Sequence, residues 1–153
     1  MWRAMSVVLG MAAMTAGCGR PWNNMTMPAK EADGLRLLGL TELELNTTGD
    51  GVQVQVYVQV SEDIEATRFR FELYEFVPYD ANPRGRRLVL WPDIEIGPAG
   101  VTNRYWRGHL GAYEFVLPVE PRPAAGKTYL LEVTAIGERT RLNDMIKLNL
   151  KHS

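Results

Sequence analysis

Five valines alternate with polar residues between Gly51 and Val60, and this alternation constrains the fold more than any other feature of the chain. With a side-chain period of two, the valines share one face of a strand, while three glutamines and Tyr57 share the other. β-Branched residues fit a pleated surface that is buried on one side. A single strand cannot bury its own apolar face, so the rest of the chain must supply an opposing sheet.

The remaining sequence predicts further strands separated by turns rich in glycine, proline and aspartate. A change of apolar phase near Thr41 predicts a kink in the first strand region. Apolar residues at helical spacing in 101–110 predict one short helical turn over an end of the sheets. The expected strands lie at 35–46, 52–60, 67–77, 88–96, 112–119, 129–136 and 142–150. We therefore expect an all-β, antiparallel β-sandwich of about seven strands, with at most one short helical turn.

Length and charge limit the possible classes of protein. A chain of 153 residues has room for one domain. Its formal net charge of −1 gives no basic field, so nucleic acid is not an expected partner. The single cysteine excludes an internal disulfide, so the domain must be stabilised by its own core.

The first eighteen residues have the layout of a secretory signal peptide. Arg3 precedes an apolar run from Ala4 to Met14, and small residues follow just before Cys18. The run is shorter than the ~20 apolar residues that a membrane-spanning helix needs. We expect a signal peptide at 1–17.

The four residues Thr15-Ala16-Gly17-Cys18 resemble the lipobox of bacterial lipoproteins, in which the cysteine is acylated and becomes the mature N-terminus. The resemblance implies a lipid on Cys18 that anchors the protein in the cell envelope. Gly19, in place of the aspartate associated with inner-membrane retention, implies the outer membrane, facing the periplasm or the cell surface. Two other interpretations remain open: secretion after ordinary cleavage, and an N-terminal helix with a chance cysteine.

Residues 18–34 show no sustained period and are rich in proline, asparagine and glycine, which predicts a tether between the lipid and the domain. The β-sandwich domain is expected to cover 35–153. Cleavage before Cys18 removes Arg3 and no acidic residue, which leaves 16 basic and 18 acidic residues and a net charge of −2.

Tyr129 begins an alternating strand directly after a turn rich in proline and glycine. This arrangement resembles the penultimate strand of fibronectin type III and other immunoglobulin-like domains, where the tyrosine hydroxyl bonds an upstream backbone group. The alternative is a core aromatic residue with a wet tip. The segments from Phe69 to Phe76 and from Arg87 to Asp93 look like parts of bacterial lipoproteins of an uncharacterised family, which implies no particular chemistry.

The sequence predicts no catalytic, metal-binding or cofactor-binding residues. His109 and His152 are the only imidazoles, and neither lies in a nucleophile motif. Asp93 and Glu95 at strand spacing could join a calcium site, although an exposed strand edge is the more ordinary explanation. Arg84, Arg86 and Arg87 could contact anionic polymers or simply lie in a solvated loop.

Three aromatic residues, Trp91, Tyr105 and Trp106, could form a platform for sugar rings. Exposure of a coplanar pair would favour that interpretation, and burial in the core would oppose it. The sequence is therefore consistent with two hypotheses about function. The first is a non-enzymatic interaction or assembly module on a lipid anchor, whose envelope partner is not identified. The alternative is a carbohydrate-binding module on the same anchor.

Overall fold

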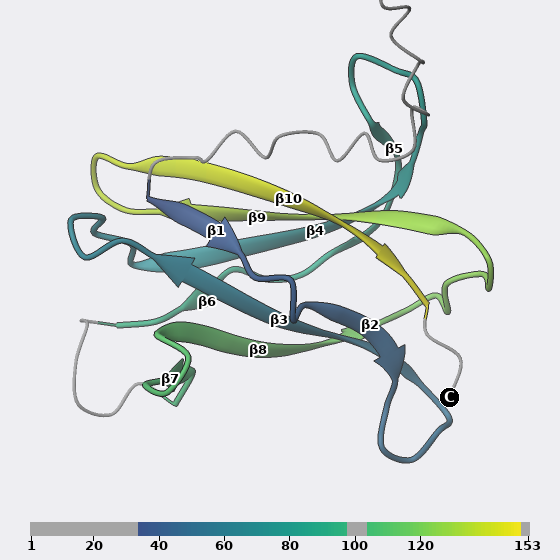
Figure 1. The fold of residues 1–153 in the computed structure, drawn as a ribbon, viewed down its shortest axis with the longest axis horizontal. Helices are drawn as coiled ribbons and strands as arrows, with labels where there is room; N and C mark the ends of the chain where they lie inside the picture. Colours follow the sequence, from purple (N-terminus) through teal and green to yellow (C-terminus); the bar gives the residue numbers. More distant parts are fainter. Residues whose placement is uncertain (1–33, 98–103, 151–153) are drawn as a thin grey trace, which may run out of the picture.

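A computed structural model describes residues 34–97 and 104–150, which form two antiparallel β-sheets packed face to face (Figure 1). The described residues contain ten strands and no helix, so the expected all-β sandwich is confirmed, with more strands than the seven expected. It follows that no helix in this part of the chain could cross a membrane.

Each sheet has five strands. The first has the order β1–β3–β8–β7, with β2 also paired to β3; the second has the order β10–β9–β4–β5, with β6 also paired to β4. The strands of the first sheet are β1 (Leu35–Leu37), β2 (Glu42–Leu45), β3 (Val52–Val60), β7 (Trp106–Arg107) and β8 (Ala112–Val119). Those of the second are β4 (Arg68–Phe76), β5 (Arg84–Leu90), β6 (Ile94–Glu95), β9 (Thr128–Ile136) and β10 (Arg141–Asn149).

The core lies between β3 and β8 on one side and β4 and β9 on the other. The first four valines of β3 are buried, as the alternation predicts, while Gln59 on the other face is exposed. Opposite them, Phe69 and Phe71 of β4 are fully buried, and both rings contact Phe115 of β8. These rings pack closely between the sheets, so a shift in the register of β4 or β8 would remove their contacts.

The kink predicted near Thr41 is confirmed. Leu37 pairs with Val58 and Glu42 pairs with Gln55, so β1 and β2 flank an insertion in the ladder. Within it, the buried Thr41 hydroxyl accepts a hydrogen bond from the backbone N–H of Tyr57 at 3.1 Å. This side chain supplies the acceptor that a continuous strand would have provided.

Two strands near prolines lie at or near sheet edges, as expected because proline has no N–H to donate to a neighbouring strand. β5 lies at the edge of its sheet, and the half of β8 that contains Pro118 has only β3 as a neighbour. Trp91 follows β5 and donates its indole N–H to the Pro118 carbonyl at 2.7 Å. This hydrogen bond joins the two sheets along their open side.

The opposite side of the sandwich is closed by β1, β2 and β10. The Asp144 carboxylate accepts the backbone N–H of Leu37 at 2.7 Å, and Leu43 forms a parallel bridge with Leu150. Pairing of this kind covers strand edges that would otherwise offer free backbone groups to another chain.

Tyr129 forms the corner that the sequence predicted. Its buried hydroxyl accepts the backbone N–H of Ala124 at 2.7 Å and lies 3.2 Å from the Ala124 carbonyl. The tyrosine therefore fixes the connection between β8 and β9.

The helical turn expected in 101–110 is wrong for the described part of that segment. Trp106 and Arg107 form β7, which pairs with Tyr113 and Ala112 at the start of β8. A tight turn closed by Leu110 N–H to the Arg107 carbonyl joins the two strands. Tyr105, one of the apolar residues at helical spacing, instead packs on β8, where its ring centroid lies 4.9 Å from that of Phe115.

Candidate functional site

A hollow of about 740 Å³ lies at one end of the sandwich, and we call it the end hollow. Its lining residues come from the β3–β4 loop, the end of β6 and the β7–β8 hairpin, elements that lie on the left in Figure 1. The residues that line it are Val60, Glu62, Ile64, Glu65, Ala66, Thr67, Arg68, Glu95, Gly97, Trp106 and Tyr113.

The β3–β4 loop is held against its neighbours by backbone hydrogen bonds and by one close approach between backbones. Ser61 N–H donates to the Gly34 carbonyl at 2.8 Å, and Thr67 N–H donates to the Ile136 carbonyl at 2.9 Å. A Cβ at Gly137 would lie 1.9 Å from the Glu65 carbonyl oxygen, so only glycine permits this contact. The loop wall of the end hollow is therefore fixed at both ends.

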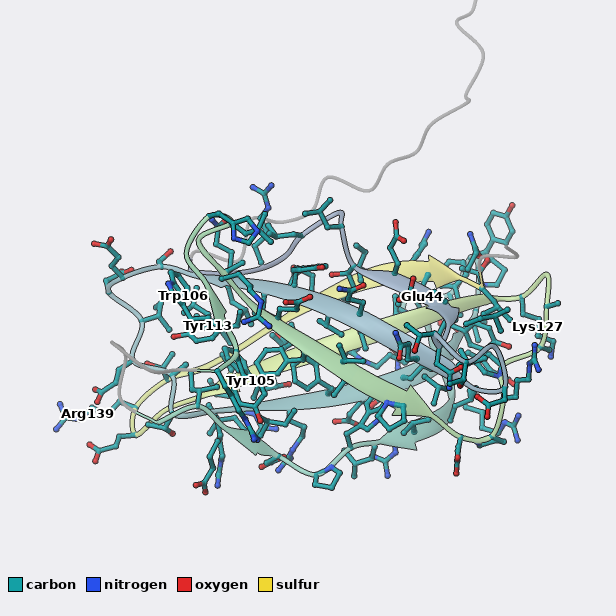
Figure 2. All side chains as sticks on the ribbon, turned by 90° about the horizontal axis from the view of Figure 1, so that it is seen from below. Glu44, Tyr105, Trp106, Tyr113, Lys127 and Arg139 are labelled. Carbon is teal, nitrogen blue, oxygen red and sulfur yellow. The ribbon has the colours of Figure 1, made fainter. Side chains whose placement is uncertain are left out.

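The aromatic wall comes from the β7–β8 hairpin. Trp106 is 44% exposed, and its ring meets that of Tyr113 edge to face with centroids 5.1 Å apart. Figure 2 shows the two side by side at the end of the molecule opposite Lys127. Tyr113 is 9% exposed and packs on Phe69 of the core, with ring centroids 5.5 Å apart. The exposed indole thus rests on a ring that the core holds in place.

The Tyr113 hydroxyl has no hydrogen-bond partner among the described residues, although nine-tenths of the side chain is buried. Burial raises the pKa of this hydroxyl above its ordinary value, so it stays protonated at neutral pH. Because its side chain lines the end hollow, the hydroxyl is available to a ligand there as a donor and an acceptor.

The charged wall is mainly acidic. Glu62, Glu65 and Glu95 are exposed, and none of them has an ion-pair partner among the described residues. Arg68 is the one cation of the described lining, and its guanidinium lies 3.6 Å from the Asp93 carboxylate. Asp93 is also the partner of Arg70, so the described lining carries three carboxylates against one guanidinium.

The three residues of the expected platform do not lie on one surface. Trp91 is buried in the core, where its indole N–H is bonded to Pro118. Tyr105 is half-buried against Phe115, beneath the guanidinium of Arg104. Only Trp106 is exposed, and its ring partner in the end hollow is Tyr113.

Sequence reasoning missed most of the acidic wall. Glu62 and Glu65 lie in a segment that was interpreted only as a loop, and Glu95 was considered only as a calcium ligand beside Asp93. The available signal was the concentration of acidic residues in the loop, where Glu62, Asp63 and Glu65 occur within four positions.

The arginines of β5 form ion pairs with carboxylates on the outer face of the second sheet. Arg84 donates two hydrogen bonds to Glu132, of 2.7 and 2.8 Å, and Arg87 lies 2.9 Å from Glu72. Arg86 pairs with Glu75 at 2.9 Å. These ion pairs account for the basic cluster and leave little excess charge for an anionic polymer.

Glu132 lies at the centre of this face on β9, where it is 8% exposed. Burial favours its neutral form, but hydrogen bonds from Arg84 and Asn143, together with the Arg84 charge, outweigh burial and hold its pKa below the ordinary value. The carboxylate is therefore ionised and fully engaged at neutral pH, which fits a structural role.

A second polar network lies on the outer face of the first sheet. Glu114 accepts hydrogen bonds from Gln55 at 2.7 Å, from the Tyr57 hydroxyl at 3.1 Å and from Arg107. The hydrogen bond from Gln55, together with those from Arg107 and Tyr57, lowers the pKa of Glu114. The network links β7 to β3 and so steadies the hairpin that carries Trp106.

The described residues contain no group of three or more His, Cys, Asp or Glu side chains placed to hold a metal ion. Asp93, considered as a calcium ligand, is bonded to Arg70 through two hydrogen bonds of 2.9 and 3.1 Å. His109 is exposed in the β7–β8 turn. His152 and Cys18 lie outside the described residues.

Comparison with known proteins gives no match to the chain among family models, curated proteins or solved structures. The fold and the end hollow therefore define a class only: a small all-β sandwich with an aromatic and acidic hollow at one end.

Proposed function

We propose that the chain is a non-enzymatic interaction module of the cell envelope, attached by a lipid on Cys18 and recognising its partner through the end hollow. The single observation that carries the binding role is the half-exposed ring of Trp106 over a hollow whose other wall is acidic. Exposed aromatic rings in concave sites are common anchors for ligands and partners.

The immunoglobulin-like character of the domain belongs to the same proposal. In immunoglobulin-like sandwiches the second and fifth strands pair in one sheet, and the third, sixth and seventh strands pair in the other. Here β3 pairs with β8, while β4, β9 and β10 are neighbours in the second sheet. The corner hydrogen bonds of Tyr129 give further support.

The lipid anchor rests on the pattern of residues 1–18. Replacing the acceptor in Cys18→Ala should prevent acylation, so the protein should leave the membrane fraction and retain the mass of the uncleaved chain. Fractionation followed by mass spectrometry checks both outcomes. A Cys18→Ala protein that stays in the membrane fraction with the wild-type mass would contradict the anchor.

The interaction role can be tested by site-specific crosslinking in intact cells. A photo-crosslinking amino acid at Glu62, on the rim of the end hollow, should give a discrete adduct. The same amino acid at Lys127, at the opposite end of the molecule in Figure 2, is the matched control. Equal adducts at both positions, or none at Glu62, would contradict recognition through the end hollow.

A carbohydrate ligand is the second candidate. The exposed indole of Trp106 favours it, because sugar rings stack on such faces and carboxylates accept hydrogen bonds from sugar hydroxyls. The burial of Trp91 leaves a single exposed ring rather than a platform of three.

A further inference from the structure

We propose that the end hollow binds an organic cation, an ammonium or guanidinium group carried on an apolar stem. This inference rests on the proposed function and names the chemistry of the ligand. Both a basic side chain of a partner polypeptide and a free amine have this chemistry.

Charge complementarity is the first argument. Glu62, Glu65 and Glu95 bring three negative charges to the lining, and Arg68 is the only described lining residue that opposes them. Asp93, the ion-pair partner of Arg68, is also bonded to Arg70 through two hydrogen bonds, so the excess charge of the lining is that of three carboxylates against one guanidinium. A ligand cation would neutralise part of this charge, whereas a neutral ring would leave it unchanged.

The aromatic wall supplies the second argument. A cation over the face of a tryptophan or tyrosine ring is attracted by the ring quadrupole. Trp106 lines the hollow and is 44% exposed, and its ring contacts that of Tyr113 on the core side. The Tyr113 residue is 9% exposed and its hydroxyl has no partner among the described residues, so its oxygen can accept an N–H from the same ligand.

The size and spread of the site supply the third argument. A volume of about 740 Å³ lies within the range of ~300–1,000 Å³ that small ligands occupy. The carboxylates are not placed to meet around one metal ion, because no such group occurs among the described residues. Dispersed acceptors beside an aromatic face suit a cation with several N–H donors on an extended stem.

The experiment uses the full-length protein in neutral-detergent micelles and follows the Trp106 indole N–H by NMR, assigned by its loss in Trp106→Phe. The cationic probes are cadaverine and a blocked five-residue peptide with a central lysine. The neutral probes are the same peptide with norleucine and a chito-oligosaccharide. We expect saturable shifts with at least one cationic probe and binding at least tenfold weaker for the norleucine peptide.

Three conservative variants test the acidic wall together, as Glu62→Gln, Glu65→Gln and Glu95→Gln in one chain. All three side chains are exposed, so the fold should be retained, and we expect cation binding to weaken at least tenfold. The matched control is Glu120→Gln, an exposed glutamate at the far end of β8, which should leave binding unchanged. Raising the salt concentration should weaken binding to the wild type.

Shifts with the lysine peptide alone support a polypeptide partner, and shifts with cadaverine as well support a free amine. The inference is overturned if neither cation binds, if the norleucine peptide binds equally well, or if the triple variant binds as tightly as the wild type. Binding of the oligosaccharide alone would contradict the inference that the ligand is a cation. It would support the second candidate function, a carbohydrate-binding module. Failure of the Glu62 crosslink would instead overturn the proposed function itself.

Discussion

Val56 shows how strongly single positions are determined in this chain. Its side chain is fully buried between the sheets, in register with Phe115 across the ladder. Gln59, three positions further along the same strand, faces solvent and pairs across the ladder with Arg36. One strand therefore offers a dry and a wet position for comparison.

We expect Val56→Asp to lower the free energy of unfolding by several kcal/mol, because it buries a carboxylate without a partner. Gln59→Asp should cost under ~1 kcal/mol, since its charge stays in water beside Arg36. Urea denaturation of both variants measures the difference. Equal losses would show that β3 is buried on both faces, contrary to the structure.

For single residues, the sequence predicted which side chains alternate along a strand, but not which residues distant in the sequence they contact. The valines of β3 and the corner role of Tyr129 follow from local patterns. The partner of Trp91 is the carbonyl of Pro118, which lies 27 positions away. No local signal reveals such a contact, so Trp91 was placed on a surface platform although it belongs to the core.

Among the elements, the break between β1 and β2 depends on one hydroxyl. Thr41→Val keeps the shape of the side chain but removes the acceptor for Tyr57 N–H. We expect a loss of about 1–3 kcal/mol, the cost of leaving a buried donor unsatisfied. Chemical denaturation checks the value, and Thr47→Val, at an exposed site in the next turn, should have no comparable effect.

The carboxylates on the outer face of the second sheet should make the free energy of unfolding depend on pH in the acid range. Glu132 has a lower pKa in the folded chain than in the unfolded chain, so its contribution is complete above the ordinary value of ~4.3. That contribution is lost as the pH falls through the lower folded value. Asp93 and Glu114, whose pKa values are also lowered, act in the same direction.

We therefore expect the free energy of unfolding to decrease as the pH is lowered from about 5 towards 3. Glu132→Gln should reduce stability at pH 7 by about 2 kcal/mol, because Arg84 loses its charged partner, and should flatten the acid dependence. Denaturation series at several pH values measure both effects. A variant with an unchanged pH profile would show that Glu132 does not carry this dependence.

Two features of the strands could not be predicted from the sequence: burial on the second face of β9 and the structure of residues 104–110. The pattern of β9 predicted one buried face from Tyr129 to Ala135, yet Leu130, Glu132 and Thr134 on its other face are also buried. The cover comes partly from Arg84, which is 48 positions from Glu132. In 101–110 the spacing of the apolar residues resembled that of a helix, whereas pairing with β8 determined the structure of Trp106 and Arg107.

For the whole molecule, the first strand begins at Leu35, and Gly34 already has a positive φ of 111° and tight contact with Ile64. A chain that starts at Gly34 therefore retains every contact described here. We expect its melting temperature to lie within a few degrees of that of a chain starting at Gly19. A loss of more than ~2 kcal/mol would show that residues 19–33 stabilise the domain.

The hydrogen bond between Gly34 and Ser61 has a consequence for orientation. It places the point where the chain enters the domain at the rim of the end hollow, beside Glu62 and Ile64. With a lipid on Cys18, the residues from Gly19 to Asp33 can extend no further than roughly 55 Å. The end hollow is then held within this distance of the bilayer, so it meets only ligands in the adjacent solution. Basic molecules accumulate over anionic lipids within about a Debye length, ~8–10 Å, so the hollow would meet a raised concentration of a cationic ligand when the domain lies close to the bilayer.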